Sequence, residues 1–470
     1  MTDLCVPPHY EGVCLTLSRG TRLGTEEITK PQRFGDSIHV GQYRPMHPQA
    51  LLETCAILLG QVLKFEHPAD ACVSRFFKEH RNLGPRERAT LAETTYNVLR
   101  KKLLFEAFAN GAPRGSGSRE RKMAILGFYG PRDFIKSVLT EQEKAWLDAC
   151  DATNPVNHAS GLLELHRHNL PDWLAQSLKT QLGRDFWALS DCLNTSAPLD
   201  IRVNSFMAKR EEAQAELARA AIKSVATPYS PWGLRIQGRP PINKTSTFTE
   251  GKIEVQDEGS QILAMLVDAK RGEMVMDFCA GAGGKTLALG AMMRSTGRLY
   301  AFDTSAHRLD SFKSRLARSG LSNVHPAAIS HERDERIKRL AGKLDRVLVD
   351  APCSGLGTLR RNPDLKWRQK PSDIAELNLK QAAILQSAAR LLKSGGRLVY
   401  ATCSVLPEEN EAIARAFSVA NPDFEPLEVS DILTHLKVND AKKLCDGEFL
   451  RLWPHRHGTD GFFAAVWQRK

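Results

Sequence analysis

The chain has 470 residues, of which 42% are hydrophobic and 25% are charged, values normal for a globular protein with room for about three domains. Its 65 Lys and Arg residues exceed its 54 Asp and Glu residues, giving a net charge of +11, which favours a polyanionic partner such as nucleic acid. No apolar stretch has membrane-spanning length, the first residues lack a signal-peptide pattern, and the ten cysteines include no Cys-x-x-Cys pair. We therefore expect a cytoplasmic protein with no membrane contact, no metal and no disulfide framework.

The first part of the chain is predicted to be an arm followed by helices. Residues 1–45 show little periodicity and are expected to form a loose N-terminal arm. From Pro48 apolar residues recur at the spacing of one helix face, and further helices are expected over 69–78 and 85–105. Segment 46–150 is therefore predicted to be an all-helical domain.

Basic residues cluster in this helical segment, with Phe76 and Phe77 between them. The basic residues are Arg75, Lys78, Arg81, Arg86, Arg88, Arg100, Lys101 and Lys102. Cations interleaved with aromatic rings favour an RNA-facing surface. The alternative is a solvated face above a core that the two phenylalanines anchor.

The remaining chain mixes helix and strand signals and then alternates them. Segment 151–255 is expected to be a small α+β module. In segment 256–470 we expect strands near 274–279, 298–303, 324–329, 345–350, 397–403 and 461–467, and helices near 257–268, 285–293, 306–319, 373–392 and 408–420. Such alternation predicts a mostly parallel α/β sheet covered by helices on both faces.

A glycine-rich turn, Asp277–Thr286, directly follows the first of these strands. Small residues let a backbone approach a ligand, and the helix that begins near Lys285 offers unpaired N–H groups. The turn matches neither the Walker A pattern nor the G-x-G-x-x-G dinucleotide pattern. Asp303 ends the next strand, about 20 positions past the glycine turn. An acidic residue at this position typically accepts hydrogen bonds from ribose hydroxyls. An adenosine-containing cofactor is indicated, and S-adenosylmethionine is the natural candidate.

Two cysteines follow neighbouring predicted strands, Cys353 after Asp350-Ala351-Pro352 and Cys403 after Thr402. The carboxyl edge of a parallel sheet is where such folds bind ligands. A thiolate that adds to C6 of a cytosine makes C5 nucleophilic enough to accept a methyl group, and a second thiol can assist release. Asp350 can receive the exocyclic amine of the base or donate to a ring nitrogen. On the residues alone, either cysteine is placed to attack.

The segment after Cys353 carries cations and a tryptophan, namely Arg360, Arg361, Lys366, Trp367 and Arg368. We expect this loop to hold RNA phosphates and to stack a base. A plain surface loop is the alternative.

Several sequence blocks resemble the signatures of the Nop/Sun family of RNA 5-methylcytosine methyltransferases. They are Asp277–Thr286, Asp350–Gly357, Arg360–Trp367, Tyr400–Asn410, Val255–Gln261 and Thr459–Phe463. The resemblance implies a Rossmann-like class I S-adenosylmethionine-dependent methyltransferase domain, preceded by the small module and by a helical domain similar to the antitermination factor NusB. It also implies ribosomal RNA as the substrate.

The resemblance also implies residue roles. Cys403 would be the nucleophile, Cys353 would promote product release, and Asp350 would lie between cofactor and base. The cofactor would be held by Cys279, Ala280, Gly281, Ala282, Gly283, Gly284, Lys285, Asp303 and Asp350 and, near the adenine, by His331.

Two departures from the family pattern affect the cofactor site. The usual Ala-Pro before Gly-Gly-Lys is Gly281-Ala282 here, which predicts a more mobile loop. His331 stands near the position where the family often has an aspartate that contacts adenine.

The sequence thus predicts transfer of a methyl group to C5 of an RNA cytidine through a cysteine adduct. Methylation of an exocyclic amine is a rival chemistry, but Asp350-Ala351-Pro352-Cys353 differs from the Asn/Asp-Pro-Pro-aromatic loop typical of it. A non-catalytic RNA-binding scaffold that retains the fold is the other alternative. No oligomeric state is implied.

Overall fold

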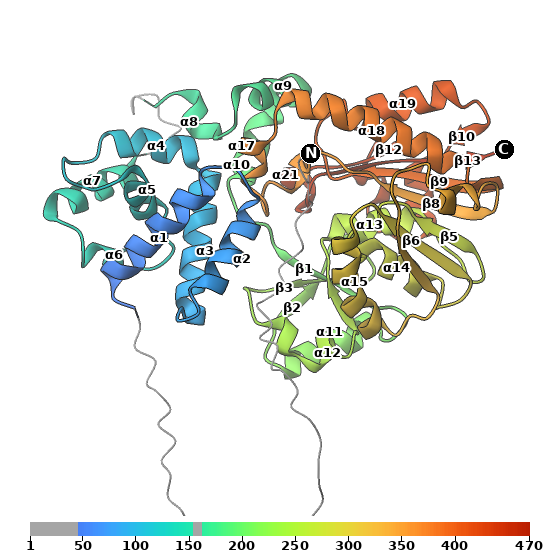
Figure 1. Cartoon of the computed structure of the whole chain (residues 1–470), viewed down its shortest axis with the longest axis horizontal. Helices are drawn as coiled ribbons and strands as arrows, with labels where there is room; N and C mark the ends of the chain where they lie inside the picture. Colours follow the sequence, from blue (N-terminus) through green and yellow to red (C-terminus); the bar gives the residue numbers. More distant parts are fainter. Residues whose placement is uncertain (1–45, 154–161) are drawn as a thin grey trace, which may run out of the picture.

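The computed structural model describes residues 46–153 and 162–470. They form a group of helices, a small four-stranded sheet and a large mixed sheet with helices on both of its faces (Figure 1). The arm predicted at 1–45 lies outside the described residues. None of the helices in these ranges combines the length and the apolar character that a bilayer crossing requires.

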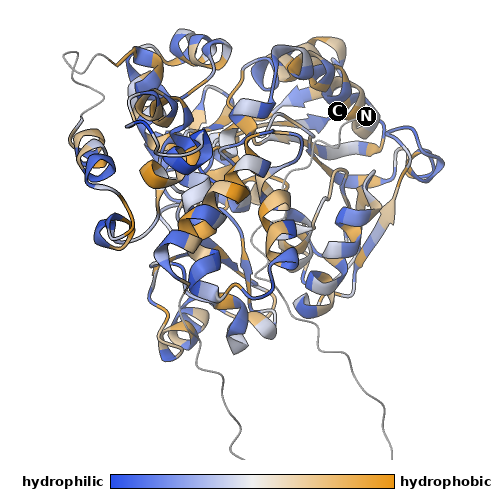
Figure 2. Cartoon of the chain, turned by 60° about the vertical axis from the view of Figure 1, so that its left-hand side comes forward, coloured by the Kyte–Doolittle hydropathy of each residue, from blue (hydrophilic) through white to orange (hydrophobic). Residues whose placement is uncertain are grey.

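The N-terminal part is helical, as predicted. Its helices are α1 (Pro48–Val62), α2 (Ala69–Glu79), α3 (Pro85–Arg100), α4 (Lys102–Asn110), α5 (Arg119–Gly127), α6 (Arg132–Lys136) and α7 (Glu141–Ala152). Hydrophilic and hydrophobic residues alternate along them (Figure 2), and the apolar ones share one core. The single helix predicted over 85–105 is two helices, because the backbone leaves helical geometry at Lys101 (φ −114°, ψ 30°).

Phe76 and Phe77 are part of this core rather than of an RNA-facing surface. Both side chains are buried, and Phe76 packs edge-on against Phe77. The basic residues on their helix, Arg75 and Lys78, are exposed. The interleaved spacing therefore reflects an amphipathic helix, whose apolar and charged faces alternate along the sequence.

The next segment begins with helices α8 (Glu164–His168), α9 (Asp172–Leu182) and α10 (Phe186–Leu193). The small sheet follows, with strands β1 (Leu199–Val203), β2 (Ser224–Ala226), β3 (Gly233–Ile236) and β4 (Ile253–Val255) and helices α11 (Arg210–Arg219) and α12 (Ser246–Thr249). Its strand order is β2-β3-β1-β4, and all pairs are antiparallel.

The large sheet has the strand order β11-β12-β13-β9-β8-β5-β6-β7, with β10 also paired to β13. Its strands are β5 (Met274–Asp277), β6 (Arg298–Asp303), β7 (Val324–Ala328), β8 (Leu344–Asp350), β9 (Leu392–Thr402), β10 (Phe424–Pro426), β11 (Cys445–Asp446), β12 (Phe449–Leu452) and β13 (Phe462–Arg469). Strands β5 to β9 pair in parallel, and β13 joins β9 antiparallel. The six predicted strands are confirmed within a few residues, whereas the short β10, β11 and β12 were not foreseen.

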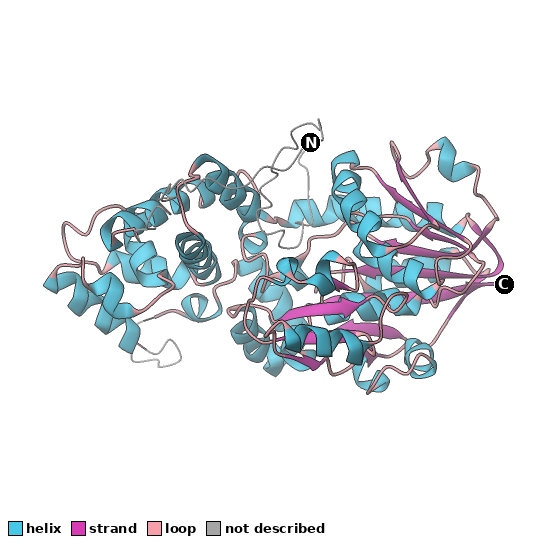
Figure 3. Cartoon of the chain, turned by 90° about the horizontal axis from the view of Figure 1, so that it is seen from below, coloured by secondary structure: helices cyan, strands magenta, loops and turns pink. Residues whose placement is uncertain are grey.

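Helices cover both faces of this sheet, as the alternating pattern predicts. The helices of this part of the chain are α13 (Glu258–Leu266), α14 (Gly284–Met292), α15 (Ala306–Ser319), α16 (Glu335–Lys338), α17 (Leu365–Arg368), α18 (Pro371–Ala389), α19 (Glu411–Ala420), α20 (Val429–His435) and α21 (Pro454–His457), of which α17 and α21 pack on the helices before the small sheet. In Figure 1, α18 and α19 lie on one side of the sheet and α13, α14 and α15 on the other. Seen from below, the helical part forms one end of the molecule and the sheets the other (Figure 3).

The basic loop after Cys353 contacts the helical domain instead of being open to RNA. The Lys366 ammonium, buried at 1% exposure, donates to the carbonyl of Arg100 (2.8 Å). The Trp367 indole donates to the carbonyl of Leu99 (2.8 Å), while the carboxylate of Asp364 accepts the N–H of Ala69. The expectation that these side chains hold phosphate and stack a base is therefore wrong, since they fix the helical domain against the large sheet.

Arg361, from the same loop, joins two other parts of the chain. Its guanidinium contacts the carboxylates of Asp257 (2.8 Å) and Asp460 (2.6 Å), each of which is 2% exposed. Burial by itself lowers the pKa of Arg361, but Asp460 and Asp257 raise it above its ordinary value. Arg361 is thus an internal ion-pair partner and not the phosphate contact that the sequence suggested.

Candidate functional site: a thiol pair beside a glycine turn

The structure brings Cys353 and Cys403 together. Strands β8 and β9 are parallel neighbours with Asp350 opposite Ala401, so both chains leave the sheet at the same edge. The two Sγ atoms lie 3.4 Å apart. Cys353 is buried at 8% exposure, whereas Cys403 is more open. One substrate atom could therefore be approached by either sulfur.

Backbone contacts fix the position of Cys403. Its carbonyl accepts the N–H of Gly357, and the carbonyl of Gly357 accepts the N–H of Gly461 (both 2.8 Å). A Cβ on Gly357 would lie 2.7 Å from the Cys403 oxygen and 2.0 Å from the Gly461 oxygen. Only glycine permits so close an approach of three chain segments.

Lys285 connects the glycine turn to the end of β8. Its ammonium bonds the Asp350 carboxylate at 2.6 Å. Burial lowers the pKa of Lys285, but Asp350 and then Cys403 raise it, and the net effect is a rise. A charged lysine is therefore retained beside Asp350, at the end of β8.

The glycine turn is held by β6 and α15. The N–H of Gly281 donates to Asp303 Oδ2 (2.7 Å), and Arg315 donates to the carbonyl of Ala282 (2.7 Å). Gly281 and Gly283 have φ values of 54° and 79°, which L side chains rarely adopt. The extra mobility expected from Gly281-Ala282 stays a prediction.

Replacing Gly283 by alanine should destabilise this turn. The new Cβ would lie 2.0 Å from the ring of Phe312, so steric overlap adds to the strain of positive φ, and we expect a loss of about 2–4 kcal/mol. Gly395→Ala is the matched control, because Gly395 has φ 77° but nothing within 4 Å of its Cβ position. Thermal melting of both variants should show a clearly larger drop for Gly283→Ala; equal drops would contradict the packing argument.

Asp277, the last residue of β5, is a buried carboxyl with one unsatisfied oxygen. Thr286 donates to Oδ2 (2.7 Å), but Oδ1 has no partner among the described residues. Burial raises the pKa of Asp277 to about 7. Since the folded state binds this proton more tightly than the unfolded state, the associated stability is present at low pH and is lost as the pH rises through 7.

Asp277→Asn should remove this pH dependence. Between pH 6 and pH 8.5 the wild type should lose about 1.4 kcal/mol that the variant keeps. The difference in melting temperature between variant and wild type should therefore shift in favour of the variant across this range. A constant difference would show that Asp277 is already ionised at pH 6.

The start of α14 is suited to binding the carboxylate group of the predicted cofactor, S-adenosylmethionine. Gly283, its N-cap, offers no side-chain acceptor, and the first N–H groups of any helix lack intrahelical partners. Such an uncapped helix start binds carboxylates and phosphates. Asp303 is buried at the adjacent strand end, where one oxygen accepts Gly281 and the other accepts Ser305.

The remaining predicted residues lie around the same edge. Cys279 is half-buried in the turn, and burial raises the pKa of its thiol, so it is not an activated nucleophile. His331 is exposed in the loop after β7, and its Nδ1 accepts the N–H of Arg333 (3.0 Å). Its neighbour Asp334 caps α16 by accepting the N–H of Arg336. His331 is thus near the site edge by topology, without a contact to the other predicted residues.

Sequence reasoning missed the polar groups behind the thiols. Glu409 is fully buried and bonds Ser354 and Ser404, the residues after the two cysteines. Gln381 of α18 bonds both the carbonyl of Pro352 and Glu409 (3.0 Å each). No local signal marks this role, because Glu409 stands between Glu408 and Asn410 in a polar run whose burial the sequence does not indicate.

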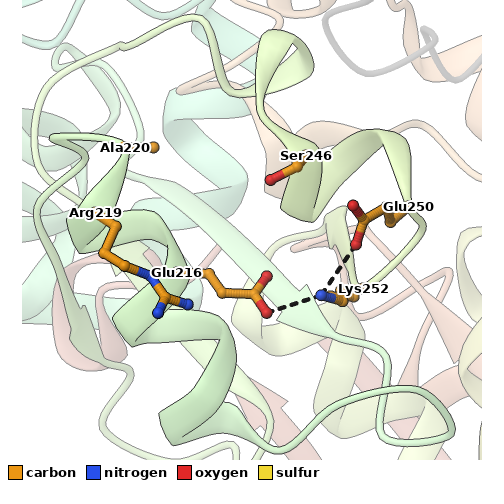
Figure 4. Close-up of a pocket in the computed structure, with 6 residues that line it drawn as sticks. All are labelled: Glu216, Arg219, Ala220, Ser246, Glu250 and Lys252. Atoms are coloured by element: carbon orange, nitrogen blue, oxygen red, sulfur yellow. Dashed lines mark hydrogen bonds and ion pairs between the residues drawn. The ribbon is translucent and has the colours of Figure 1, made fainter.

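Two other features do not add to this site. In the described part of the chain, no group of three or more His, Cys, Asp or Glu side chains could hold a metal ion. A pocket between α11 and α12 of the small module is lined by Glu216, Arg219, Ala220, Ser246, Glu250 and Lys252 (Figure 4). There Lys252 pairs with Glu216 (2.8 Å) and Glu250 (3.0 Å), so its cation is already neutralised.

Comparison with known proteins supports this assignment of the fold. Residues 264–468 match the family model of the 16S rRNA methyltransferase RsmB/F, and residues 170–243 match a ferredoxin-like domain of RsmF/B-like methyltransferases. A probable ribosomal RNA small subunit methyltransferase B of Synechocystis is 30% identical over 443 residues, which are 87% of this chain and 97% of that protein. One from Bacillus subtilis is 31% identical, covering 74% and 76%.

A solved structure also resembles this chain over most of its length. The crystal structure of PH0851 superposes with a TM-score of 0.71 at 29% identity, covering 91% of this chain and 100% of that chain. The class I methyltransferase fold and its cofactor, S-adenosylmethionine, are thereby established, and the resemblance seen in the sequence blocks is confirmed. The chain belongs to the RsmB/F family of 16S rRNA methyltransferases.

Proposed function

We propose that this protein transfers a methyl group from S-adenosylmethionine to C5 of a cytidine in ribosomal RNA, in the cytoplasm. The observation that carries the proposal is the pair of sulfurs 3.4 Å apart at the carboxyl edge of β8 and β9, beside the glycine turn. Methylation of an exocyclic amine needs no thiol, whereas C5 chemistry uses a nucleophile and gains from a second thiol.

The chemistry requires a sulfur to add to the base first. The Cys403 thiolate forms a bond to C6, and the electron pair of the C5–C6 double bond makes C5 nucleophilic. The bound cofactor supplies an electrophilic methyl group for C5. A water molecule acting as a base then takes the C5 proton, the electron pair of the C5–H bond restores the C5–C6 double bond, and the C6–sulfur bond breaks to return the thiolate.

The greater exposure of Cys403 and the raised pKa of Cys353 support Cys403 as the nucleophile, in agreement with the family resemblance. The hydrogen bond with Cys403, and then burial, raise the pKa of the Cys353 thiol well above its ordinary value. Cys353 therefore keeps a proton that it can use during release, which leaves the more open Cys403 to attack.

The groups around the thiols have complementary roles in this proposal. Asp350, held by Lys285, would orient the base through its exocyclic amine or ring nitrogen. Asp303 and the turn from Cys279 to Lys285 would hold the cofactor, and His331 would contact the adenine.

We further propose that the other domains bind the RNA. Segments 46–150 and 151–255 would serve as a NusB-like domain and a small RNA-binding module, next to the methyltransferase domain over 256–470. Exposed cations support this assignment, namely Arg75, Lys78, Arg81, Arg86 and Lys101. Phosphate contacts of this kind position a nucleic acid without reading its sequence.

The test is to incubate the purified protein with methyl-labelled cofactor and 16S rRNA, either free or in the small ribosomal subunit. Hydrolysis and chromatography then separate 5-methylcytidine from N4-methylcytidine. Label in 5-methylcytidine is expected. Label in the exocyclic product, or cofactor binding without transfer to either RNA form, would refute the proposal.

A further inference from the structure

One face of helix α15 contacts the glycine turn. Arg308, Phe312 and Arg315 are spaced by four and three residues, so they share this face. A Cβ on Gly281 would lie 2.6 Å from Arg308 Nη2. A Cβ on Gly283 would lie 2.0 Å from the ring of Phe312. The two glycines of the turn thus pack directly against α15, and the third residue of the face is Arg315.

Arg315 reaches the turn through the backbone of Ala282. Its Nη1 donates to the Ala282 carbonyl (2.7 Å). Its Nη2 lies 3.7 Å from the position of a Cβ on Gly284, the first residue of α14. The guanidinium therefore lies where the turn enters the helix. Alanine has no ring that restricts its φ as a proline ring would, so contacts with other parts of the chain must hold this residue in place.

The ends of the turn are held by backbone contacts. Ala280 donates its N–H to the carbonyl of Phe302 in β6 (2.9 Å), and the carbonyl of Gly283 accepts the N–H of Leu287 in α14 (2.9 Å). One end of the turn is thus attached to the large sheet and the other to the helix. The bond from the guanidinium holds the residue between these two ends, which is Ala282.

The other side of the guanidinium is bonded to the small sheet. Arg315 Nε (3.1 Å) and Nη2 (3.0 Å) both contact Oε2 of Glu254, which belongs to β4. The side chains are 12% exposed for Arg315 and 6% exposed for Glu254. A guanidinium is a rigid planar fork, so two contacts to one carboxylate fix its orientation. The direction of Nη1 toward the glycine turn is therefore set by a residue of the small sheet.

Arg318, three residues further along α15, offers a close comparison. Its Nη2 contacts Oε1 of Glu254, so the two arginines share this carboxylate. Its side chain is 18% exposed, and its guanidinium lies 4.0 Å from the ring centre of Phe248. Among the described residues, it makes no hydrogen bond to the glycine turn. Both arginines thus join α15 to the small sheet, but Arg315 also continues to the turn.

We propose that Arg315 is a positioning residue for the cofactor. It joins Glu254 of the small sheet to the carbonyl of Ala282 and so keeps the glycine turn in the conformation that binds S-adenosylmethionine. This inference rests on the cofactor role proposed above for the turn and deepens it. It also gives the small sheet a part in cofactor binding, because β4 supplies the carboxylate that orients the guanidinium.

The test measures cofactor affinity and turn mobility without RNA. Wild type, Arg315→Met and the control Arg318→Met are titrated calorimetrically with S-adenosylmethionine, and amide hydrogen exchange over 278–287 is followed in the cofactor-free proteins. Arg315→Met should raise the Kd about tenfold, as expected for the loss of one hydrogen bond from a charged donor. It should also speed exchange in the turn. Arg318→Met loses its own ion pair with Glu254 but should keep the Kd and the exchange rates of the wild type.

An unchanged Kd in folded Arg315→Met, or an equal rise in both variants, would overturn the proposal. If Arg315→Met does not fold, Arg315→Lys serves instead. A single ammonium cannot reproduce the fork that bonds Glu254 and Ala282 together, so the Kd should still rise, and wild-type affinity would also overturn the proposal. Methylation of another RNA atom would refute the proposed function but leave these cofactor affinities unchanged, so the two failures are distinguishable.

Discussion

Cys403→Ala should abolish methyl transfer, lowering the rate by roughly 10³-fold or more. Without the sulfur, no bond to C6 can form and C5 stays a poor nucleophile. The variant should still bind the cofactor, since Cys403 follows β9 whereas the glycine turn follows β5. Transfer of a labelled methyl group to 16S rRNA measures the first effect, and calorimetric titration with S-adenosylmethionine measures the second.

Cys353→Ala should give a different defect from Cys403→Ala. The adduct between Cys403 and the base should form but be released slowly, so a protein–RNA species should accumulate on denaturing gels. Cys192→Ala is a suitable control, because this half-buried cysteine lies on α10, outside the thiol pair. Adduct formation by Cys403→Ala together with none by Cys353→Ala would reverse the roles of the two thiols.

Arg361→Met should be among the most destabilising single changes. The guanidinium pairs with Asp257 and Asp460, which are almost completely buried. Removing the guanidinium leaves two buried carboxylates, each 2% exposed, without their cation. Breaking a buried ion pair in this way lowers the free energy of unfolding by about 3–5 kcal/mol. Thermal melting should show a large drop, and the drop should shrink at low pH, because burial raises the pKa of Asp460, which can then take up a proton in the folded state.

The control for Arg361 is a cation in an exposed pair. Arg456 contacts Asp185 with both side chains about half exposed, so Arg456→Met should change stability by less than about 1 kcal/mol. Adding Asp257→Asn and Asp460→Asn to Arg361→Met should recover part of the loss. If Arg361→Met melts like the wild type, the ion pairs contribute little and the three segments are held by packing alone.

Most strands and helices of the methyltransferase domain were predictable, because short-range sequence patterns determine them. Strand β6 and helix α15 have the predicted bounds, since apolar and aromatic runs and amphipathic spacing act locally. The parallel order also follows from alternation, and it places the ends of β8 and β9 at one edge. That is why Cys353 and Cys403 could be proposed as neighbours from the sequence.

The basic loop shows where such reasoning fails. Lys366 and Trp367 have the composition of an RNA-binding surface, yet they contact the carbonyls at the end of α3. Composition reports that a side chain needs a partner for its N–H groups, but it does not say whether that partner is a phosphate or another domain. Residues more than 260 positions apart meet here, and no local pattern encodes that contact.

The sequence by itself determined the strand ends and the glycine turn and placed a cysteine after each of two neighbouring strands, because each feature depends on residues close together along the chain. Only the tertiary structure decided the distance between the two sulfurs, the pairing of Lys285 with Asp350 and the burial of Glu409. These depend on packing between distant segments, where the loss of water determines which charges must be paired.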